Sequence, residues 1–403
     1  MHNLHRFVSF CTAVVAFSSS VEAGASGDVF TPVIASTLSP EAYPIFGTDG
    51  AYHVVYELQL TNTKSVPATI QKIEVLAGST ESQVITGFSD GELLKRLRTL
   101  APQPATDATI EPNGARLFYI ELTFKDAASV PKVLEHHLYL IGAPNPGPAK
   151  PAPLNYVVAP LKISDDKPLI IGPPLAGTGW VAANGCCNPD IPHRGSVQSV
   201  NGALYNSQRF AIDWMRLDDQ GRMVHGEESD VHNYPDYAAD VLAIADAKVV
   251  SVLNNLDDQV PGRLPEPSSI TIETVDGNHV VLDLGAGRFA FYAHLQKDSI
   301  KVHPGDSVKK GAVLGKLGNT GNTSAPHFHC HIMNRASPMA ADGIPYLIDA
   351  FNFSGQIDIA AFEAAPGLAG DWGKGRVAKA EPRQRQFPLN LNIINFAPAG
   401  ASR

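Results

Sequence analysis

Residues 302–333 read VHPGDSVKKGAVLGKLGNTGNTSAPHFHCHIM, and this stretch indicates the fold of the second half of the chain. Turn-forming residues cluster at 304–306 and at 318–322, and short apolar runs lie between and after them. Such spacing predicts short β-strands joined by turns. The same pattern continues through residues 175–350, where β-rich runs alternate with glycine-containing turns. We therefore expect an all-β domain over these residues.

Three histidines at alternate positions end that stretch, and they are the sharpest indication of chemistry in the chain. His327, His329 and His331 lie within the run APHFHCHIM. Successive side chains of a strand point to opposite faces, so the three imidazoles share one face. A catalytic zinc ion takes three protein ligands from histidine and carboxylate and keeps one position open for water. The alternative is a half-exposed strand that happens to be rich in histidine.

Two further apolar strands each contain one polar residue. Asp213 lies in the run RFAIDW, and a carboxylate is rarely buried without a partner. A metal ion would compensate its charge; an ion pair with Arg209 or Arg216 is the alternative. His294 ends the run AFYAHL, and a histidine at the end of a strand can reach a site at the rim of the sheet. Taken alone, a histidine in this position is more often structural.

The composition excludes several classes of protein. The chain has 403 residues, 44% of them apolar and 18% charged, which is enough apolar sequence for two or three domains with buried cores. The 31 Lys and Arg residues against 40 Asp and Glu give a net charge of −9. No basic block occurs, so general nucleic-acid binding is not expected. After the N-terminal segment, no run of about 18 apolar residues occurs that could span a membrane.

Residues 1–23 are interpreted as a secretory signal. Arg6 precedes a short apolar stretch, and Val21-Glu22-Ala23 places small residues at the two positions that a signal peptidase reads. We therefore expect cleavage after Ala23 and an exported protein, either periplasmic or secreted. Lipidation of Cys11 is the alternative interpretation, but this cysteine lies early and follows a bulky residue.

Breaker residues divide the rest of the chain. Residues 24–142 contain runs of period-two alternation, which predict an immunoglobulin-like β-sandwich without catalytic residues. Residues 143–174 are rich in proline and predict a semi-rigid linker. The all-β domain at 175–350 follows, and residues 351–403 form a C-terminal tail that we expect to pack back on it.

Four pieces of the second half resemble, in this order, the lysostaphin-type zinc endopeptidases, which cut peptide cross-links of bacterial cell walls. The pieces are RFAIDW, ADVLAIADAKVV, NHVVLDLGAGRFAFYAHL and the stretch from residue 302 quoted above. The resemblance covers about residues 176–333 and implies a β-sheet core called the duplicated hybrid motif. It also implies a Zn²⁺ cofactor and a peptidoglycan peptide as substrate. Residue by residue, it implies that Asp213 and His329 are zinc ligands and that His294 and His327 are catalytic.

One ligand departs from the pattern of that family. The family usually has its first zinc-binding histidine four residues before the aspartate, and here that position is Arg209. We expect His193 to take this role from an upstream strand or loop, because loop-closure entropy grows only slowly with loop length. His225 and His232 are the alternatives, and both lie in a polar segment that reads as a surface loop.

His331 and the cysteines are also off the pattern. His331 either orients a metal ligand or is a rim residue without a role. For the adjacent Cys186 and Cys187, a disulfide or simple burial is favoured over a structural zinc site in an oxidising compartment. Cys330 points away from His329 in a strand, so its thiol should not join the metal.

The sequence thus predicts an exported zinc endopeptidase in which zinc activates a water molecule. Either His294 or His327 takes the proton from that water, and the other stabilises the oxyanion or protonates the leaving amine. One alternative is a catalytically inactive regulator that binds the cell wall or a partner protein, since loss of the adjacent histidine would weaken metal binding. A second alternative is an exported zinc-binding protein without hydrolytic activity.

Overall fold

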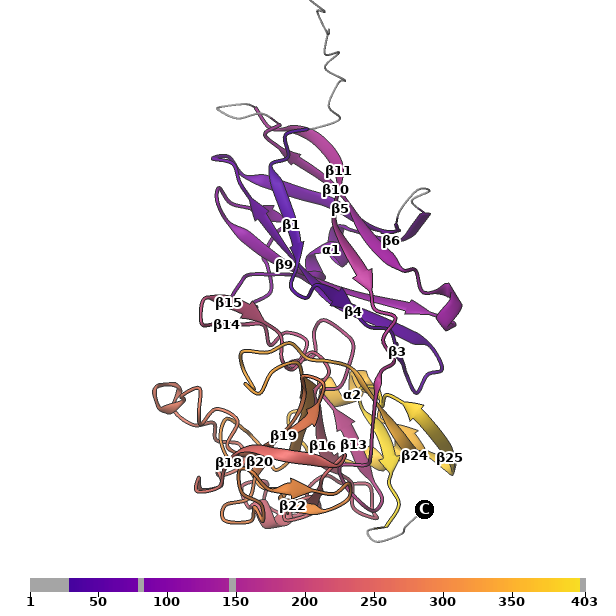
Figure 1. The fold of residues 1–403 in the computed structure, drawn as a ribbon, viewed down its shortest axis with the longest axis vertical. Coiled ribbons are helices and arrows are strands. Elements are labelled where there is room, and N and C mark those ends of the chain that lie inside the picture. The colour runs from indigo at the N-terminus through magenta and orange to yellow at the C-terminus, as the bar shows by residue number, and fades with distance from the viewer. Residues whose placement is uncertain (1–28, 79–82, 145–149, 399–403) are drawn as a thin grey trace, which may run out of the picture.

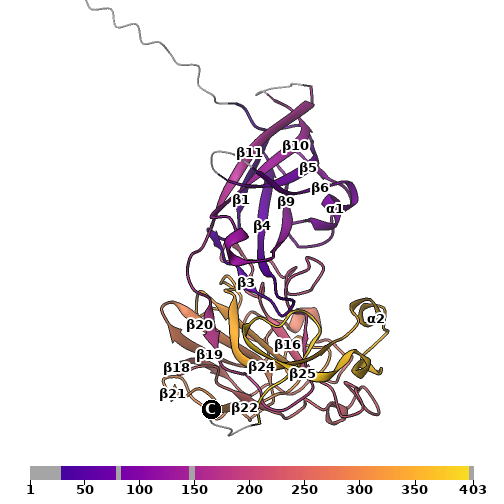
Figure 2. The same ribbon diagram turned by 90° about the vertical axis from the view of Figure 1, so that its right-hand side faces the viewer.

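A computed structural model describes residues 29–78, 83–144 and 150–398. The predicted signal peptide, residues 1–23, lies outside the described residues. Strands dominate these ranges, and they form two parts stacked along the longest axis of the molecule (Figure 1 and Figure 2). Within the described ranges, no helix is long and apolar enough to cross a membrane.

Two sheets build the N-terminal part. The first contains β1 (Val33–Thr37), β3 (Ile45–Phe46), β4 (Tyr52–Asn62), β7 (Leu97–Arg98) and β9 (Ala115–Phe124). The second contains β2 (Glu41–Ala42), β5 (Ala68–Ala77), β6 (Gln83–Ser89), β8 (Thr109–Ile110), β10 (Val133–Gly142) and β11 (Ala152–Ile163). Their orders are β1-β4-β9-β7 with β3 beside β4, and β2-β11-β10-β5-β6 with β8 beside β5. The short helix α1 (Asp90–Arg96) follows β6.

Strand β4 is buried on both faces, whereas its alternating pattern predicts one buried face. Val54, Tyr56 and Leu58 face the core between the two sheets, as period two requires. On the opposite face, Val55 joins the core of the C-terminal part, and Glu57 is completely buried. The second part of the molecule therefore covers the outer face of this sheet at β4.

The prediction of a linker over 143–174 is wrong for residues 152–163. These residues form β11, which pairs with β10 along nine positions of its length. The prolines are tolerated because only Lys162 and Ile163 of β11 pair with β2, so most of this strand is an edge. Polyproline II and β backbones are similarly extended, so a proline-rich run cannot by itself separate a linker from an edge strand.

One large sheet organises the C-terminal part. Its strands are β12 (Leu169–Ile171), β13 (Trp180–Ala183), β16 (Ile212–Arg216), β18 (Ala247–Leu253), β19 (Asn278–Gly285), β20 (Arg288–Leu295), β21 (Ser307–Val308), β23 (Phe328–Met333), β24 (Tyr346–Gln356), β25 (Arg376–Gln386) and β26 (Asn392–Asn395). Their order is β12-β24-β26-β13-β16-β23-β20-β19-β18-β21, with β25 beside β24.

Smaller elements surround that sheet. They are the pairs β14 (Gln198–Val200) with β15 (Ala203–Tyr205) and β17 (Asp240–Leu242) with β22 (Val313–Lys316), and helix α2 (Ile359–Glu363). The predicted boundary at residue 350 falls inside β24. Residues 351–398 accordingly supply β25 and β26 to the main sheet, because β26 pairs with both β13 and β24.

Candidate functional site

Neighbouring central strands bring the predicted site residues together. Asp213 on β16 lies directly opposite His329 on β23, and His329 in turn lies opposite Ala293 on β20. Paired positions of adjacent antiparallel strands have Cβ atoms about 4.5–5.5 Å apart, so side chains on one face meet. The Nδ1 atom of His329 is 2.9 Å from Oδ1 of Asp213.

His193 joins these two residues from a loop. One ligand atom from each of His193, Asp213 and His329 lies within 4.8 Å of the other two, and all three side chains are buried. The Nδ1 atom of His193 donates to the carbonyl oxygens of Asn184 at 2.9 Å and Ala211 at 3.1 Å. These bonds fix the tautomer and leave the Nε2 lone pair facing Asp213, whose Oδ2 is 3.3 Å away.

The two histidines predicted to be catalytic lie beside this group. The rings of His294 and His327 have centroids 4.6 Å apart. His294 donates from Nδ1 to the carbonyl of Thr320 at 2.7 Å, and His327 donates from Nδ1 to that of Ala325 at 2.8 Å. In both rings Nδ1 is thus bonded to the backbone, and in His327 the Nε2 atom is 3.4 Å from Oδ1 of Asp213.

His294 also has an unusual backbone conformation, with φ at 59°. Residues other than glycine enter this left-handed region at a cost of about 1–3 kcal/mol when the surroundings enforce it, often at functional sites. In this structure the backbone N–H of His294 donates to the carbonyl of Asp276, and its own carbonyl accepts from the N–H of Gly318. The conformation turns the end of β20 so that the ring lies next to His327.

His331 contacts a predicted ligand directly. Its Nδ1 atom lies 2.9 Å from Nε2 of His329, and the side chain is completely buried. Since Nδ1 of His329 faces Asp213, this contact holds the ring of His329 from behind. The geometry favours the orienting interpretation of His331 over a rim residue without a role.

Burial and neighbouring charges shift the pKa values of the site residues in different directions. Burial lowers the pKa of His329 to about 4 and that of His294 well below its ordinary value, so both rings are neutral at pH 7. Burial opposes ionisation of Asp213, but the neighbouring His193 and His327 outweigh it and hold its pKa well below the usual range. Burial likewise opposes protonation of His327, whose pKa is nevertheless raised by the charge of Asp213. A basic His327 is thus placed beside neutral rings.

The site lies in a cavity of about 440 Å³. Its lining includes His193, Asp213, His294, His327 and His329. The cavity also contains Asn184 and Asp276, which the sequence analysis did not single out. The side-chain amide of Asn184 donates to Oδ2 of Asp213 at 2.8 Å.

Two buried carboxyl groups near the site were also missed. Burial raises the pKa of Asp276 to about 7 and that of Asp236 to about 8. Both oxygens of the Asp236 carboxyl group lack a hydrogen-bond partner among the described residues. An isolated aspartate in a polar loop gives no sequence signal of burial, so only the fold could have identified these groups.

The alternatives weighed from the sequence lie elsewhere. His225 and His232 are exposed and contact Asp218 and Asp230. Neither Arg209 nor Arg216 pairs with Asp213 in the part of the chain that the structure describes. Arg209 binds a different carboxylate, and Arg216 donates from Nε to the carbonyl of Thr178.

The adjacent cysteines form a disulfide, as expected, and not a metal site. Cys186 and Cys187 are bonded to one another, and both are buried. Cys330 is a buried free thiol whose side chain belongs to the apolar core, on the opposite face of β23 from the histidines. It therefore takes no part in the site.

The donor set at the site fits a zinc ion. Two imidazoles and one carboxylate are the ligand types that catalytic zinc takes, and a fourth position toward the cavity would remain for water. The buried carboxylate of Asp213 is ionised beside His327, and a cation held at this group would further balance its charge. The structure thus contains a candidate metal-binding group composed of His193, Asp213 and His329.

Comparison with known proteins finds similarity to one peptidase family. Residues 232–341 match the model of peptidase family M23, which confirms the resemblance to lysostaphin-type peptidases. The matched range contains His294, His327 and His329, whereas His193 and Asp213 precede it.

Two relatives match shorter segments. Peptidoglycan DD-endopeptidase ShyA of Vibrio cholerae is 38% identical over 65 residues, which are 16% of this chain and 15% of that protein. Glycyl-glycine endopeptidase ALE-1 of Staphylococcus capitis is 40% identical over 62 residues, which are 15% of this chain and 17% of that protein. The chain therefore spans less than a fifth of either relative's length in these matches.

Several solved structures are also similar. The catalytic domain of lysostaphin from Staphylococcus simulans is 22% identical, with 36% of this chain and 80% of that chain covered and a TM-score of 0.22. A zinc-containing peptidase from Vibrio cholerae is 14% identical, with 74% of this chain and 84% of that chain covered and a TM-score of 0.22.

Proposed function

We propose that this chain is an exported zinc-dependent endopeptidase that hydrolyses peptide cross-links of bacterial peptidoglycan. One observation carries the proposal: His193, Asp213 and His329 converge to within 4.8 Å in a cavity that also holds His294 and His327. The M23 match over residues 232–341 supports peptidase chemistry at this group. The presence of a complete three-ligand set favours an enzyme over a regulator that has lost its metal.

His193, Asp213 and His329 would hold the ion. When bound there, Zn²⁺ acidifies a coordinated water molecule toward a pKa of about 7 and polarises the scissile carbonyl. The carbonyls of Asn184 and Ala211 orient His193, and the amide of Asn184 and the ring of His331 orient the other two ligands.

His327 and His294 would move the proton. With Nδ1 donating to a backbone carbonyl, each ring presents Nε2 to the cavity as an acceptor. Asp213 raises the pKa of His327, which suits this ring to accept a proton. His294, whose pKa is lowered, would then supply the second contact to the reacting group.

The substrate class follows from the relatives' names. One acts as a DD-endopeptidase on peptidoglycan and the other as a glycyl-glycine endopeptidase. These names describe two different peptide bonds, so the proposal extends to peptidoglycan peptides and not to one bond. The proposed export rests on the predicted N-terminal signal, for which we expect cleavage after Ala23.

The domain proposal keeps the predicted order but amends the boundaries at residues 142 and 350. We propose an immunoglobulin-like sandwich from residue 24 that ends with β11 at Ile163, followed by the peptidase domain. The two-sheet arrangement and the antiparallel pairs β4 with β9 and β10 with β5 support the sandwich.

The test is the zinc content of purified residues 24–403 together with digestion of purified peptidoglycan. We expect one zinc ion per chain in the wild type, loss of that zinc in His193→Ala, and retention in the control His225→Ala, because His225 is exposed and contacts Asp218. Zinc retained in His193→Ala would overturn the ligand assignment. No zinc in the wild type after reconstitution would overturn the metallopeptidase proposal.

A further inference from the structure

His193 differs from the other two proposed ligands in how it is held. Asp213 and His329 lie on paired strands of the central sheet, whereas His193 lies in the loop 184–197 between β13 and β14. A loop residue is placed only as well as the loop is anchored. The contacts of this loop therefore decide where the first ligand lies.

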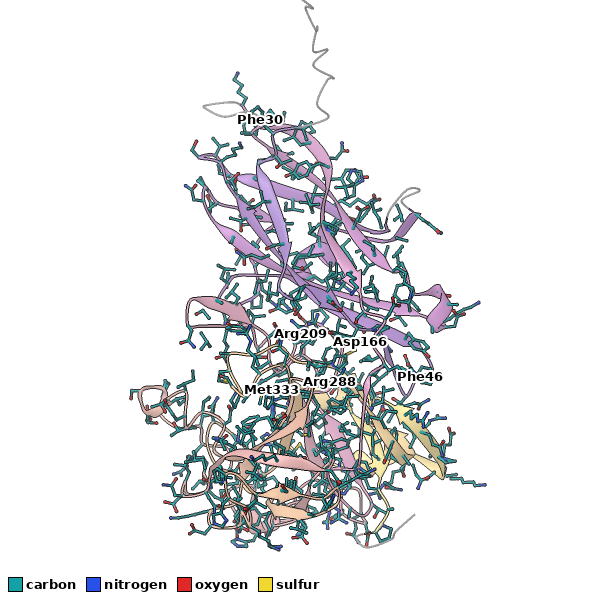
Figure 3. All side chains as sticks on the ribbon, in the orientation of Figure 1. Phe30, Phe46, Asp166, Arg209, Arg288 and Met333 are labelled. Carbon is teal, nitrogen blue, oxygen red and sulfur yellow. A yellow bond between two sulfur atoms is a disulfide. The ribbon has the colours of Figure 1, made fainter. Side chains whose placement is uncertain are left out.

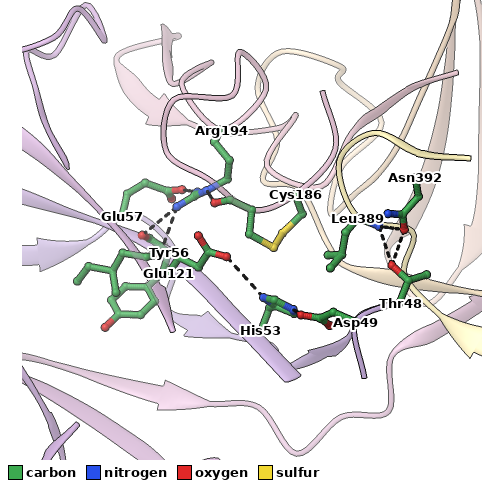
Figure 4. Close-up of a disulfide and its surroundings, with 12 residues drawn as sticks. Thr48, Asp49, His53, Tyr56, Glu57, Glu121, Cys186, Arg194, Leu389 and Asn392 are labelled. Carbon is green, nitrogen blue, oxygen red and sulfur yellow. Dashed lines mark hydrogen bonds and ion pairs between the residues drawn. A yellow bond between two sulfur atoms is a disulfide. The ribbon is translucent and has the colours of Figure 1, made fainter. Parts of the chain in front are cut away.

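The residue after His193 anchors the loop to the N-terminal sandwich. Arg194 is completely buried, and its Nη1 atom donates to the carboxylate of Glu57 on β4 (Figure 4). Its Nη2 atom donates to the carbonyl of Ile120 on β9 at 3.3 Å, and its Nε atom donates to that of Cys187 at 3.3 Å. One guanidinium thus joins two strands of the sandwich to both ends of the loop segment 187–194.

Two further contacts join the same loop to the sandwich. Asp190 pairs with Arg98 on β7 at 2.5 Å. Val197 packs with Leu117 and Tyr119 of β9 in a small buried apolar cluster. The segment that carries His193 is therefore seated on the sandwich along much of its length.

Arg209, in the C-terminal part, also binds Glu57 and so forms a buried ion cluster with Glu57 and Arg194. Its Nη2 atom is 2.7 Å from Oε2 of Glu57, and its side chain lies between the two parts of the molecule (Figure 3). The side-chain amide of Asn206 also donates to Glu57, at 3.1 Å, and to the carbonyl of Arg194, at 3.1 Å. Arg209 is the residue four positions before Asp213, where the resembling family has its histidine ligand. In this chain, the arginine at that position binds Glu57, which also binds Arg194.

We propose that Glu57 of the sandwich is a positioning residue for the metal site, which acts through Arg194 to place His193. This inference rests on the proposed function, because it assigns the sandwich a part in building the same site. The sandwich is then a component of the active site rather than an appended targeting module.

The charge of the cluster makes this coupling strong. Burial opposes ionisation of Glu57, but Arg209 and Arg194 outweigh it and lower its pKa to about 2. Glu57 is therefore ionised at every pH at which a zinc peptidase works. Residues that orient metal ligands typically change metal affinity by about 10–100-fold when they are replaced, and we expect Glu57 to fall in this range.

The experiment measures the zinc dissociation constant by competition with a chromophoric chelator in the full mature chain. The variants are Glu57→Gln, which keeps the shape and removes the charge, and Arg194→Lys, which keeps the charge and loses the planar fork. Thr48→Ala is the matched control, because Thr48 is also in the sandwich and bonds across the interface to Asn392 rather than to the loop. The visible spectrum of the cobalt(II)-substituted forms reports the ligand geometry.

We expect Glu57→Gln to raise the zinc dissociation constant by about 10–100-fold and to change the cobalt spectrum. Arg194→Lys should give a smaller change in the same direction, and Thr48→Ala should match the wild type. Unchanged affinity and spectrum in Glu57→Gln would overturn the inference, as would an equal loss in Thr48→Ala. If Glu57→Gln does not fold, Arg194→Lys decides by the same criteria. A wild type that binds no zinc would instead overturn the proposed function, and the positioning role with it.

Discussion

Two buried clusters of this molecule each place a carboxylate between nitrogen-containing side chains, and they differ in what balances the negative charge. Glu57 lies between Arg194 and Arg209, whose guanidinium groups are permanently protonated. Asp213 lies between His193 and His329, whose rings retain lone pairs when they are neutral. The first cluster carries two permanent cations, whereas the second offers two imidazoles and a carboxylate that could hold a metal ion.

The two clusters also differ in their access to solvent. Glu57 is completely buried at the interface of the two parts, where no cation could enter. Asp213 faces a cavity of about 440 Å³. A carboxylate with two arginines is thus suited to a structural role, and a carboxylate with two histidines beside an opening is a candidate metal-binding group.

The largest expected effect separates chemistry from metal binding within the second cluster. His327→Ala should lower peptidoglycan hydrolysis by about 10²–10⁴-fold, because a positioned proton acceptor contributes that much to a rate. The zinc content should stay at the wild-type level, since His193, Asp213 and His329 are intact. The measurements are turnover on purified peptidoglycan and zinc per chain, with His137→Ala in the sandwich as the control. Full activity in His327→Ala would remove this residue from the mechanism.

The next effect tests whether the first cluster is closed to outside cations. Glu57→Gln removes the carboxylate partner of the buried Arg194 and leaves Arg209 with the more distant Asp342, at 3.6 Å, so the variant should lose about 3–5 kcal/mol of unfolding free energy. Denaturant unfolding of the zinc-free chain measures this loss, and zinc should not restore it. Replacing both arginines by methionine in the Glu57→Gln chain should recover part of it.

The control for that prediction is Glu92→Gln. Glu92 is exposed and pairs with Lys95 and Arg96 on α1, so its substitution should leave stability unchanged. If Glu57→Gln were as stable as the wild type, the structural role of the ion cluster of Glu57, Arg194 and Arg209 would be contradicted.

A third, smaller effect tests the converse property of the second cluster. Free zinc at 100 times its dissociation constant should stabilise the wild type by about 2.7 kcal/mol through mass action. Asp213→Asn should lose this response, because the neutral amide cannot balance the ion. The measurement is the thermal unfolding midpoint with zinc and with a chelator. A zinc response retained by Asp213→Asn would place the metal elsewhere.

The smallest effect concerns a histidine that is buried without a metal or a carboxylate. His136 donates to the carbonyl of Ala159, accepts from the hydroxyl of Tyr56, and has a pKa lowered by burial to about 4. The unfolded chain binds this proton first, near pH 6.5, so stability is full above that pH and falls as the pH decreases toward 4. The loss between pH 7 and pH 5 should be about 2 kcal/mol.

The matched variant for His136 is His136→Gln, which keeps a donor and an acceptor but does not titrate in this range. Its unfolding free energy should fall less between pH 7 and pH 5 than that of the wild type, while zinc affinity at pH 7 should be the same. Identical pH dependence of the two proteins would show that His136 does not titrate as its burial requires.

The sequence could predict the strands and the members of the site that lie on them. Period-two alternation placed Asp213 and His329 in strands, and the spacing of the resembling motifs selected His294 and His327. The prediction failed where burial comes from contacts distant in sequence. The alternating pattern of β4 predicts only one buried face. Its own residues carry no information about the C-terminal part of the molecule, which covers Glu57. For the same reason, the burial of Asp236 and Asp276 could not be predicted from the sequence, because it depends on loops that fold over them.

The sequence by itself therefore determined the β class, the segment that matches peptidase family M23 and the residue types of the candidate metal site, because strand periodicity and ligand chemistry are local properties. Only the tertiary structure decided that His193 meets Asp213 and His329, and that Arg209 binds Glu57 instead of a metal. The sequence separations involved are large, and loop length alone restricts such contacts weakly. Close packing of two domains against one loop selects a single arrangement from the many that the chain length allows.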